Sequence, residues 1–173
     1  AQPEWEALAP GRRFEFLRRF AEILEKDPER LAGVISKETG KIRSEALGEV
    51  RAMIGKAELT RRAYEVRCAE FTSGATTTRF RAHGVLAVLG PFNYPGHLPN
   101  GHIMPALLAG NAVIFKPSNH APLVAQTILG IWQEAGLPAG VLQLLQGGVE
   151  TARTLAAHAG IDGLFFTGSS TAG

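Results

Sequence analysis

The stretch that decides the fold is Val85-Leu86-Ala87-Val88-Leu89, followed directly by Gly90-Pro91-Phe92-Asn93-Tyr94-Pro95. The first five residues form an uninterrupted apolar run, which is typical of a strand buried on both faces of a sheet. The next six contain a glycine and two prolines and predict a rigid loop. A buried strand that ends in such a loop favours an α/β fold with a parallel sheet covered by helices.

Downstream of this strand the same pattern repeats. Apolar runs at Ala112–Phe115, Val141–Leu145 and Gly163–Phe166 predict three more strands. Helical patterns separate them at Pro122–Ala135 and Glu150–Ala157, and a last helix is expected to have begun where the sequence ends. Strands that alternate with helices in this way predict right-handed βαβ units and a parallel sheet.

Upstream of the sheet, apolar residues repeat with helical spacing. Residues 16–24 form one such run, and Asp27-Pro28 is a start signal for a second helix that ends near Gly40. A longer helix with one apolar stripe is predicted from about Ser44 to Cys68. The chain therefore divides into a helical segment at 1–75, a β-prone segment at 76–84 and an α/β part at 85–173.

Charged residues are concentrated in the first part of the chain. Residues 1–70 hold 27 of the 34 Lys, Arg, Asp and Glu side chains, and the remaining 103 residues hold only seven. A segment so poor in charge cannot cover itself with a well-solvated surface. We therefore expect covering elements beyond residue 173.

Composition argues against several classes of function. The net charge of +2 and the mixture of signs do not indicate nucleic-acid binding. No apolar run approaches the roughly 20 residues of a membrane span, and the first 30 residues resemble no export signal, so we expect a cytoplasmic protein. The single cysteine excludes a disulfide framework and a multi-cysteine zinc site. No metal site is predicted from the spacing of the histidines.

Polar side chains follow the predicted strands, at the ends where open parallel sheets bind ligands. Asn93 can donate its amide NH2 to a developing oxyanion, although an asparagine in a proline-rich loop can also be a plain turn residue. Lys116 ends an apolar strand and can bind ribose hydroxyls or a phosphate. It can also simply extend its ammonium to solvent.

A third candidate is Phe166-Thr167-Gly168-Ser169-Ser170-Thr171-Ala172-Gly173. Glycine and hydroxyl residues at a helix start suit a pyrophosphate, because free N–H groups and the helix dipole favour an anion. The same residues can also be an ordinary helix cap. Cys68 lies on the apolar stripe of a charged helix, which indicates a structural thiol rather than a nucleophile.

In chain order, these and further motifs resemble those of the NAD(P)-dependent aldehyde dehydrogenases. The matching motifs, spread over nearly all of the chain, are Glu38-Thr39-Gly40-Lys41, Gly90–Pro95, Pro105–Asn111, Phe115–Ser118, Ala135–Val141 and Phe166–Ser169. Within this family, Gly96–Ile103 looks most like the N-succinylglutamate 5-semialdehyde dehydrogenases of arginine catabolism. The resemblance implies the Rossmann-like parallel sheet of a cofactor domain, preceded by packed helices and incomplete in this chain.

The resemblance also implies roles for individual residues. Asn93 is implied as the donor to the oxyanion of a thiohemiacetal, and Lys116 as a ligand of the adenosine ribose. The implied cofactor-binding residues are Phe92, Lys116, Ser118, Asn119, Gly168, Ser169, Ser170, Thr171, Ala172 and Gly173. Residues 85–173 are then the N-terminal part of a dinucleotide-binding domain. Residues 76–84 are implied as an oligomerisation segment that joins subunits into a dimer or tetramer.

Two departures from the family pattern matter for function. The family's nucleophilic cysteine and general-base glutamate lie beyond the helix that follows Gly168, so we expect the 173 residues alone to be inactive. Asn119 stands where the family commonly has a glutamate that holds the ribose 2′-hydroxyl. We therefore expect NAD as the main cofactor, with NADP tolerated.

The prediction is thus the cofactor-binding part of an enzyme that oxidises a small-molecule semialdehyde, N-succinylglutamate 5-semialdehyde, to the carboxylate. Two alternatives stay open. The first is a non-catalytic dinucleotide-binding module, and the second is a structural subunit fragment that acts through its sheet and assembly strands.

Overall fold

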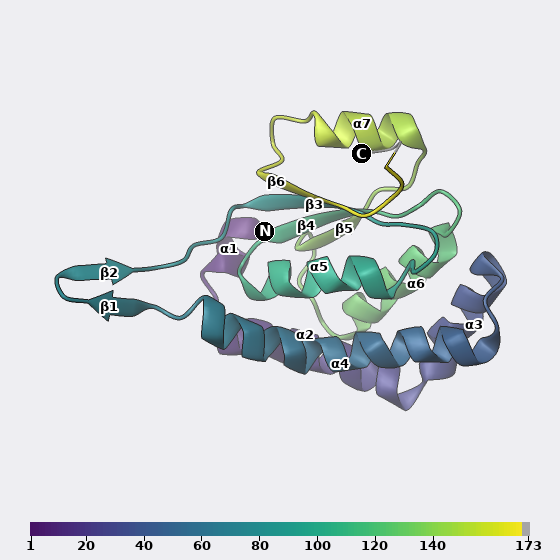
Figure 1. Cartoon of the computed structure of the whole chain (residues 1–173), viewed down its shortest axis with the longest axis horizontal. Helices are drawn as coiled ribbons and strands as arrows, with labels where there is room; N and C mark the ends of the chain where they lie inside the picture. Colours follow the sequence, from purple (N-terminus) through teal and green to yellow (C-terminus); the bar gives the residue numbers. More distant parts are fainter. Residues whose placement is uncertain (171–173) are drawn as a thin grey trace.

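The computed structural model describes residues 1–170 of the chain (Figure 1). The helices are α1 (Gln2–Glu6), α2 (Pro10–Lys26), α3 (Pro28–Thr39), α4 (Arg43–Arg67), α5 (His97–Leu108), α6 (Pro122–Glu134) and α7 (Val149–Ala156). The strands are β1 (Phe71–Ser73), β2 (Thr76–Thr78), β3 (Val85–Leu89), β4 (Ala112–Lys116), β5 (Leu142–Leu144) and β6 (Gly163–Phe166).

The central sheet is parallel, as the alternating pattern predicts. Its strand order is β5-β4-β3-β6, and β3 pairs with β4 on one side and with β6 on the other. The chain steps outward from β3 to β4 to β5 and then returns to the other side of β3. This order matches one half of a Rossmann-like sheet plus the first strand of the other half. The predicted fold class is therefore confirmed.

Helices cover the two faces of this sheet unequally. Figure 1 shows α7 alone on one face, with α5, α6 and then the long helices α2 and α4 on the other. α5 contacts β3 and β4, while α4 packs on α2, α3 and α5. The largest side chains of the core lie in this thick layer, where the rings of Phe20 and Trp132 stack with centroids 4.2 Å apart. The N-terminal helices α2, α3 and α4 therefore bury their apolar residues in this layer and turn most of their charged residues to solvent.

The helix limits follow the predicted start and stop signals closely. The Asp27 carboxylate accepts a hydrogen bond from the Arg30 N–H at 3.1 Å and so caps α3. Gly40 ends the same helix with a φ of 74°, a left-handed conformation that glycine adopts without a steric penalty. In α4, the predicted apolar stripe is buried at Ala46, Val50 and Met53.

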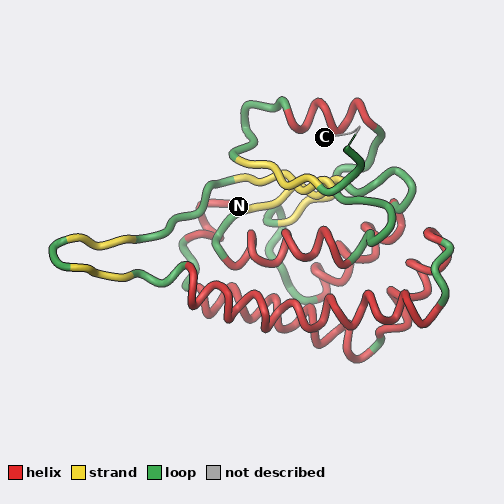
Figure 2. The backbone as a smooth tube through the Cα atoms, in the orientation of Figure 1, coloured by secondary structure: helices red, strands yellow, loops and turns green. Residues whose placement is uncertain are grey.

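A hairpin projects from the body of the molecule between α4 and β3 (Figure 2). β1 and β2 pair antiparallel, with Phe71 opposite Thr78 and Ser73 opposite Thr76. The β-prone stretch predicted at 76–81 is thus a strand only over β2. β1 falls inside the stretch assigned to the helical segment, because the last helix already ends at Arg67.

Helix α5 was not predicted, and contacts with distant residues hold both of its ends. At its C-terminal end, the Trp5 indole N–H donates to the Leu107 carbonyl and the Arg13 Nε donates to the Leu108 carbonyl, both at 2.9 Å. At its N-terminal end, the Glu49 carboxylate accepts from two backbone N–H groups. Side chains of α1, α2 and α4 therefore satisfy the unpaired backbone groups of α5.

Candidate functional site

A cavity of about 630 Å³ opens at the carboxyl ends of β3, β4 and β6. It is lined by Leu89, Gly90, Pro91, Phe92, Asn93, Leu98, Lys116, Pro117, Ser118, Asn119, Phe166, Thr167, Gly168 and Ser169. We call it the switch-point cavity, because the strand order reverses between β3 and β6, where ligands of open α/β sheets bind. It brings together candidates from all three predicted loops.

Asn93 lies on the loop between β3 and α5, with its side chain exposed beside the cavity. Its amide makes no hydrogen bond with any of the described residues. The loop is fixed at its start by the Gly90 N–H, which donates to the Lys116 carbonyl at 2.9 Å. Asn93 is therefore a free hydrogen-bond donor on a loop that is anchored to the sheet.

Lys116 is the last residue of β4, and its side chain is almost fully buried, at 6% exposed. Its ammonium donates to the carbonyl of Pro117 and, at 2.8 Å, to that of Gly147. Burial lowers the pKa of this ammonium below its usual value. An ammonium has three donors, and the described residues supply acceptors for two. The third N–H is available to a ligand in the cavity. The structure therefore does not show Lys116 simply extending its ammonium into solvent.

Ser118 and Asn119 form the rim of the cavity after β4. The Ser118 hydroxyl accepts from the His120 N–H at 3.2 Å, which makes a local turn, and Asn119 is exposed. Phe92 faces this rim from the other loop, with its ring 5.7 Å from that of His120 in an edge-on contact. Two loops from neighbouring strands thus enclose the polar mouth of the cavity.

The segment after β6 forms the third wall. The Thr167 N–H donates to the Leu89 carbonyl at 3.1 Å, which ties this segment to the end of β3. Gly168 and Ser169 line the cavity and Ser170 is exposed next to them. Thr171, Ala172 and Gly173 lie outside the described residues, and with them the predicted helix start.

A second cavity of about 400 Å³ adjoins the first and shares Leu89, Phe166 and Ser169 with it. Its other wall is formed by four residues of α7, which are Val149, Ala152, Arg153 and Ala156. None of these four was predicted as a site residue, because nothing in the pattern of a short helix shows which face turns towards the cavity.

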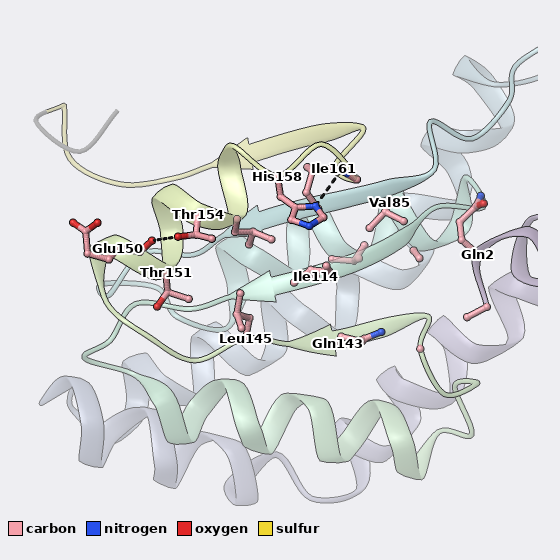
Figure 3. A pocket seen from close by; sticks show the side chains of 16 residues that line it. Gln2, Val85, Ile114, Gln143, Leu145, Glu150, Thr151, Thr154, His158 and Ile161 are labelled. Atoms are coloured by element: carbon pink, nitrogen blue, oxygen red, sulfur yellow. Dashed lines mark hydrogen bonds between the residues drawn. The ribbon is translucent and has the colours of Figure 1, made fainter.

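Another cavity, of about 750 Å³, lies between the sheet and α7 and contains none of the predicted site residues (Figure 3). Val85 and Ala112 line it, and each is the first residue of its strand. Since parallel α/β sheets bind ligands at the opposite ends of their strands, the smaller switch-point cavity is the better candidate.

Other reactive groups lie elsewhere in the molecule. Cys68 is the C-terminal cap residue of α4, is partly buried, and is followed three residues later by β1 of the hairpin. Within residues 1–170, no three His, Cys, Asp or Glu side chains gather closely enough to hold a metal ion. In the same range, no helix combines the length and apolar character needed to cross a membrane.

Comparison with known proteins agrees with this geometry. The aldehyde dehydrogenase family model matches residues 1–173. This chain belongs to the aldehyde dehydrogenase family.

Several relatives that are more than half identical to this chain are named for the same activity. The chain is 55% identical to the N-succinylglutamate 5-semialdehyde dehydrogenase of Klebsiella pneumoniae and 51% identical to that of Escherichia coli K12, over its whole length in both cases. It spans only 36% of the length of these relatives. The predicted resemblance of the chain to this group within the family is thereby confirmed.

Solved aldehyde dehydrogenase structures share the fold. An aldehyde dehydrogenase from Bartonella henselae superposes with a TM-score of 0.93 at 30% identity, over 99% of this chain and 37% of that one. The glyceraldehyde-3-phosphate dehydrogenase GapN of Methanocaldococcus jannaschii, solved with NADP, superposes with a TM-score of 0.91 at 27% identity, over 98% and 39%. The fold of this chain thus corresponds to part of the fold of these two enzymes.

Proposed function

We propose that this chain is the N-terminal, cofactor-binding part of an enzyme that oxidises N-succinylglutamate 5-semialdehyde to its carboxylate, with NAD as the main cofactor. The observation that carries the proposal is the switch-point cavity, where Asn93 and Lys116 meet at the carboxyl ends of neighbouring strands. The substrate is proposed because the chain is 55% identical, over its whole length, to a relative of that name.

The residues of the cavity fit a dinucleotide. The third N–H of the Lys116 ammonium suits a ribose hydroxyl, and the hydroxyl and amide groups of Ser118, Asn119 and Ser169 add donors and acceptors. The adjoining cavity has mainly apolar walls that suit a flat base. When bound, the cofactor accepts the hydride that the substrate loses. The protein holds it in place through these side chains.

Asn93 supplies the group that acts on the substrate. As an aldehyde carbon is attacked, negative charge develops on its oxygen, and an N–H donor held in place lowers the energy of that state. The free amide of Asn93 is such a donor. Its loop is anchored to the sheet and to α4, so the donor is oriented before the reaction starts.

The other parts of the chain have supporting roles in this proposal. Residues 1–75 pack on the cofactor domain, residues 76–84 contribute to assembly of a homodimer or homotetramer, and residues 85–173 begin the dinucleotide-binding domain. We propose that the 173 residues alone have no dehydrogenase activity, because Cys68 lies at the far end of α4 and does not line the cavity. A cytoplasmic location is proposed as well.

The test uses the full-length enzyme with N-succinylglutamate 5-semialdehyde and NAD. We expect NADH formation, and we expect Asn93→Ala to lower kcat by about 10²- to 10³-fold while the affinity for NAD changes little. Asn93→Asp is a matched variant, since it keeps the size of the side chain but cannot donate when ionised. No NADH from this substrate overturns the proposed reaction. An unchanged kcat in Asn93→Ala, with the chemical step rate-limiting, removes Asn93 from it.

A further inference from the structure

Beneath the loop that carries Asn93 lies a buried ion pair to which the proposed function gives no role. Lys41 is the last residue of the Glu38-Thr39-Gly40-Lys41 motif, and its ammonium lies 2.6 Å from a carboxylate oxygen of Glu49. The Glu49 side chain is 0% exposed and that of Lys41 14%. Removing two charges from water is costly, so a buried ion pair is expected to make further contacts that offset the lost hydration.

The Glu49 carboxylate uses its second oxygen on the loop. Oε1 accepts from the N–H of Gly96 at 2.9 Å and from the N–H of His97 at 3.0 Å. These amides start α5, three and four residues after Asn93. A carboxylate at this place satisfies two free N–H groups and the positive end of the helix dipole. Glu49 therefore fixes the point where the loop becomes helix.

Gly96 allows this close approach. A Cβ built on Gly96 would lie 2.8 Å from the Met53 sulfur and 3.3 Å from Glu49 Oε1. A side chain here would force the Met53 side chain to shift and would crowd the Glu49 oxygen that accepts from the loop. The glycine is thus part of the same arrangement.

Lys41 contacts the loop directly. Its Nζ lies 3.5 Å from the centre of the Tyr94 ring, within the range of a cation–π contact. Tyr94 is the residue next to Asn93 in the chain. The pair therefore touches the loop on both sides of Pro95, through Tyr94 before it and through Gly96 and His97 after it.

Lys41 itself is held in place by its own segment. The Ser36 hydroxyl donates to the Lys41 carbonyl at 2.7 Å, and the Lys41 N–H donates to the Thr39 hydroxyl at 3.3 Å. Gly40 turns the chain so that residue 41 follows α3 towards α4. The backbone of Lys41 is therefore fixed by its own segment, and its side chain contacts the loop from a defined position.

From these contacts we infer that Lys41 and Glu49 are positioning residues, which hold the Tyr94–His97 segment so that the Asn93 amide is aimed at the developing oxyanion. The inference rests on the proposed role of Asn93. It predicts that loss of the pair acts through Asn93, not through cofactor binding, because the pair contacts the loop at Tyr94, Gly96 and His97, and these three residues do not line the switch-point cavity.

The experiment is a double-mutant cycle in the full-length dehydrogenase. We expect Lys41→Met and Glu49→Gln each to lower kcat about 10- to 100-fold, since a small misplacement of a catalytic donor has effects of this size. The KM for NAD should stay within about twofold. Lys41→Arg should restore most of the rate, because it keeps the charge. Lys37→Met removes a lysine from an exposed position of α3 and is the matched control, with an expected kcat within about twofold of wild type.

The decisive step repeats Lys41→Met in an Asn93→Ala background. If the pair acts through Asn93, the added substitution changes kcat less than about twofold there. A full additional loss overturns the inference, because it shows a role independent of Asn93. Hydrogen exchange at the Gly96 and His97 amides adds a readout that does not need activity, and it should speed up in Glu49→Gln. If Asn93→Ala alone leaves kcat unchanged, with the chemical step rate-limiting, the proposed role of Asn93 fails instead.

Discussion

At the scale of single residues, position 119 bears on the choice of cofactor. Asn119 lies on the rim of the switch-point cavity, three residues after Lys116. An acidic residue at a ribose site accepts from the 2′-hydroxyl and repels a 2′-phosphate, which favours NAD. Asparagine is neutral, so this repulsion is missing and NADP should be discriminated against by only about 1 kcal/mol, roughly five- to tenfold.

We therefore expect Asn119→Glu to raise the ratio of kcat/KM for NAD to that for NADP in the full-length enzyme. Asn119→Gln is the control, because it lengthens the side chain by the same amount without a charge. Steady-state rates with both cofactors decide the matter. If the ratio in Asn119→Glu equals that in Asn119→Gln, residue 119 does not face the ribose.

At the scale of elements, α5 shows what sequence patterns reveal and what they hide. Helices α2, α3 and α6 were predictable because their apolar periods, and the Asp27 and Gly40 caps of α3, are local signals. α5 contains Pro99, Gly101 and Pro105, which disrupt a helical pattern. It forms because Glu49, Trp5 and Arg13 satisfy its ends from far away in the sequence. In the same way, the loops of the site were predictable but the buried pair beneath Asn93 was not.

α5 also makes the stability of the protein depend on pH. Burial lowers the pKa of His102, with a further contribution from the charge of Lys56, and the ring stacks on Phe165 with centroids 4.9 Å apart. The unfolded chain, where this histidine titrates near 6.5, thus binds more protons than the folded chain just below that pH. The contribution of His102 to stability is therefore present above about pH 6.5 and declines as the pH falls through it.

His102→Phe tests this dependence, since phenylalanine keeps the aromatic stack but cannot take up a proton. We expect the Tm of wild type to fall more between pH 7.5 and pH 5.5 than the Tm of the variant. The two proteins share all other titrating groups, so the difference between their decreases in Tm reports the effect of His102. Equal falls would show that protonation of His102 does not oppose folding.

At the scale of the whole molecule, the hairpin is the feature that the rest of this chain does not explain. An isolated two-stranded hairpin is marginally stable in water, and unpaired strand edges readily pair with another chain. Among the described residues, neither outer edge of β1–β2 pairs with another strand. Phe71 and Phe80 are 56% and 53% exposed at its base. The unpaired strand edges and the exposed aromatic side chains are what we expect of a surface that a second subunit covers.

The role of the β1–β2 hairpin in assembly can be tested in the full-length enzyme. Replacing residues 71–78 by a short Gly-Ser linker should give a smaller species in sedimentation velocity than wild type, because the deletion removes the free strand edges and one exposed aromatic ring. Phe71→Ser with Phe80→Ser keeps the hairpin and removes only apolar surface, so it should shift the equilibrium to higher protein concentration without abolishing assembly. The switch-point cavity is built from other segments, so the Tm increase caused by NAD should remain in the deleted protein. An unchanged mass of the deleted protein would show that the hairpin takes no part in assembly, and the β-prone segment would then need another role.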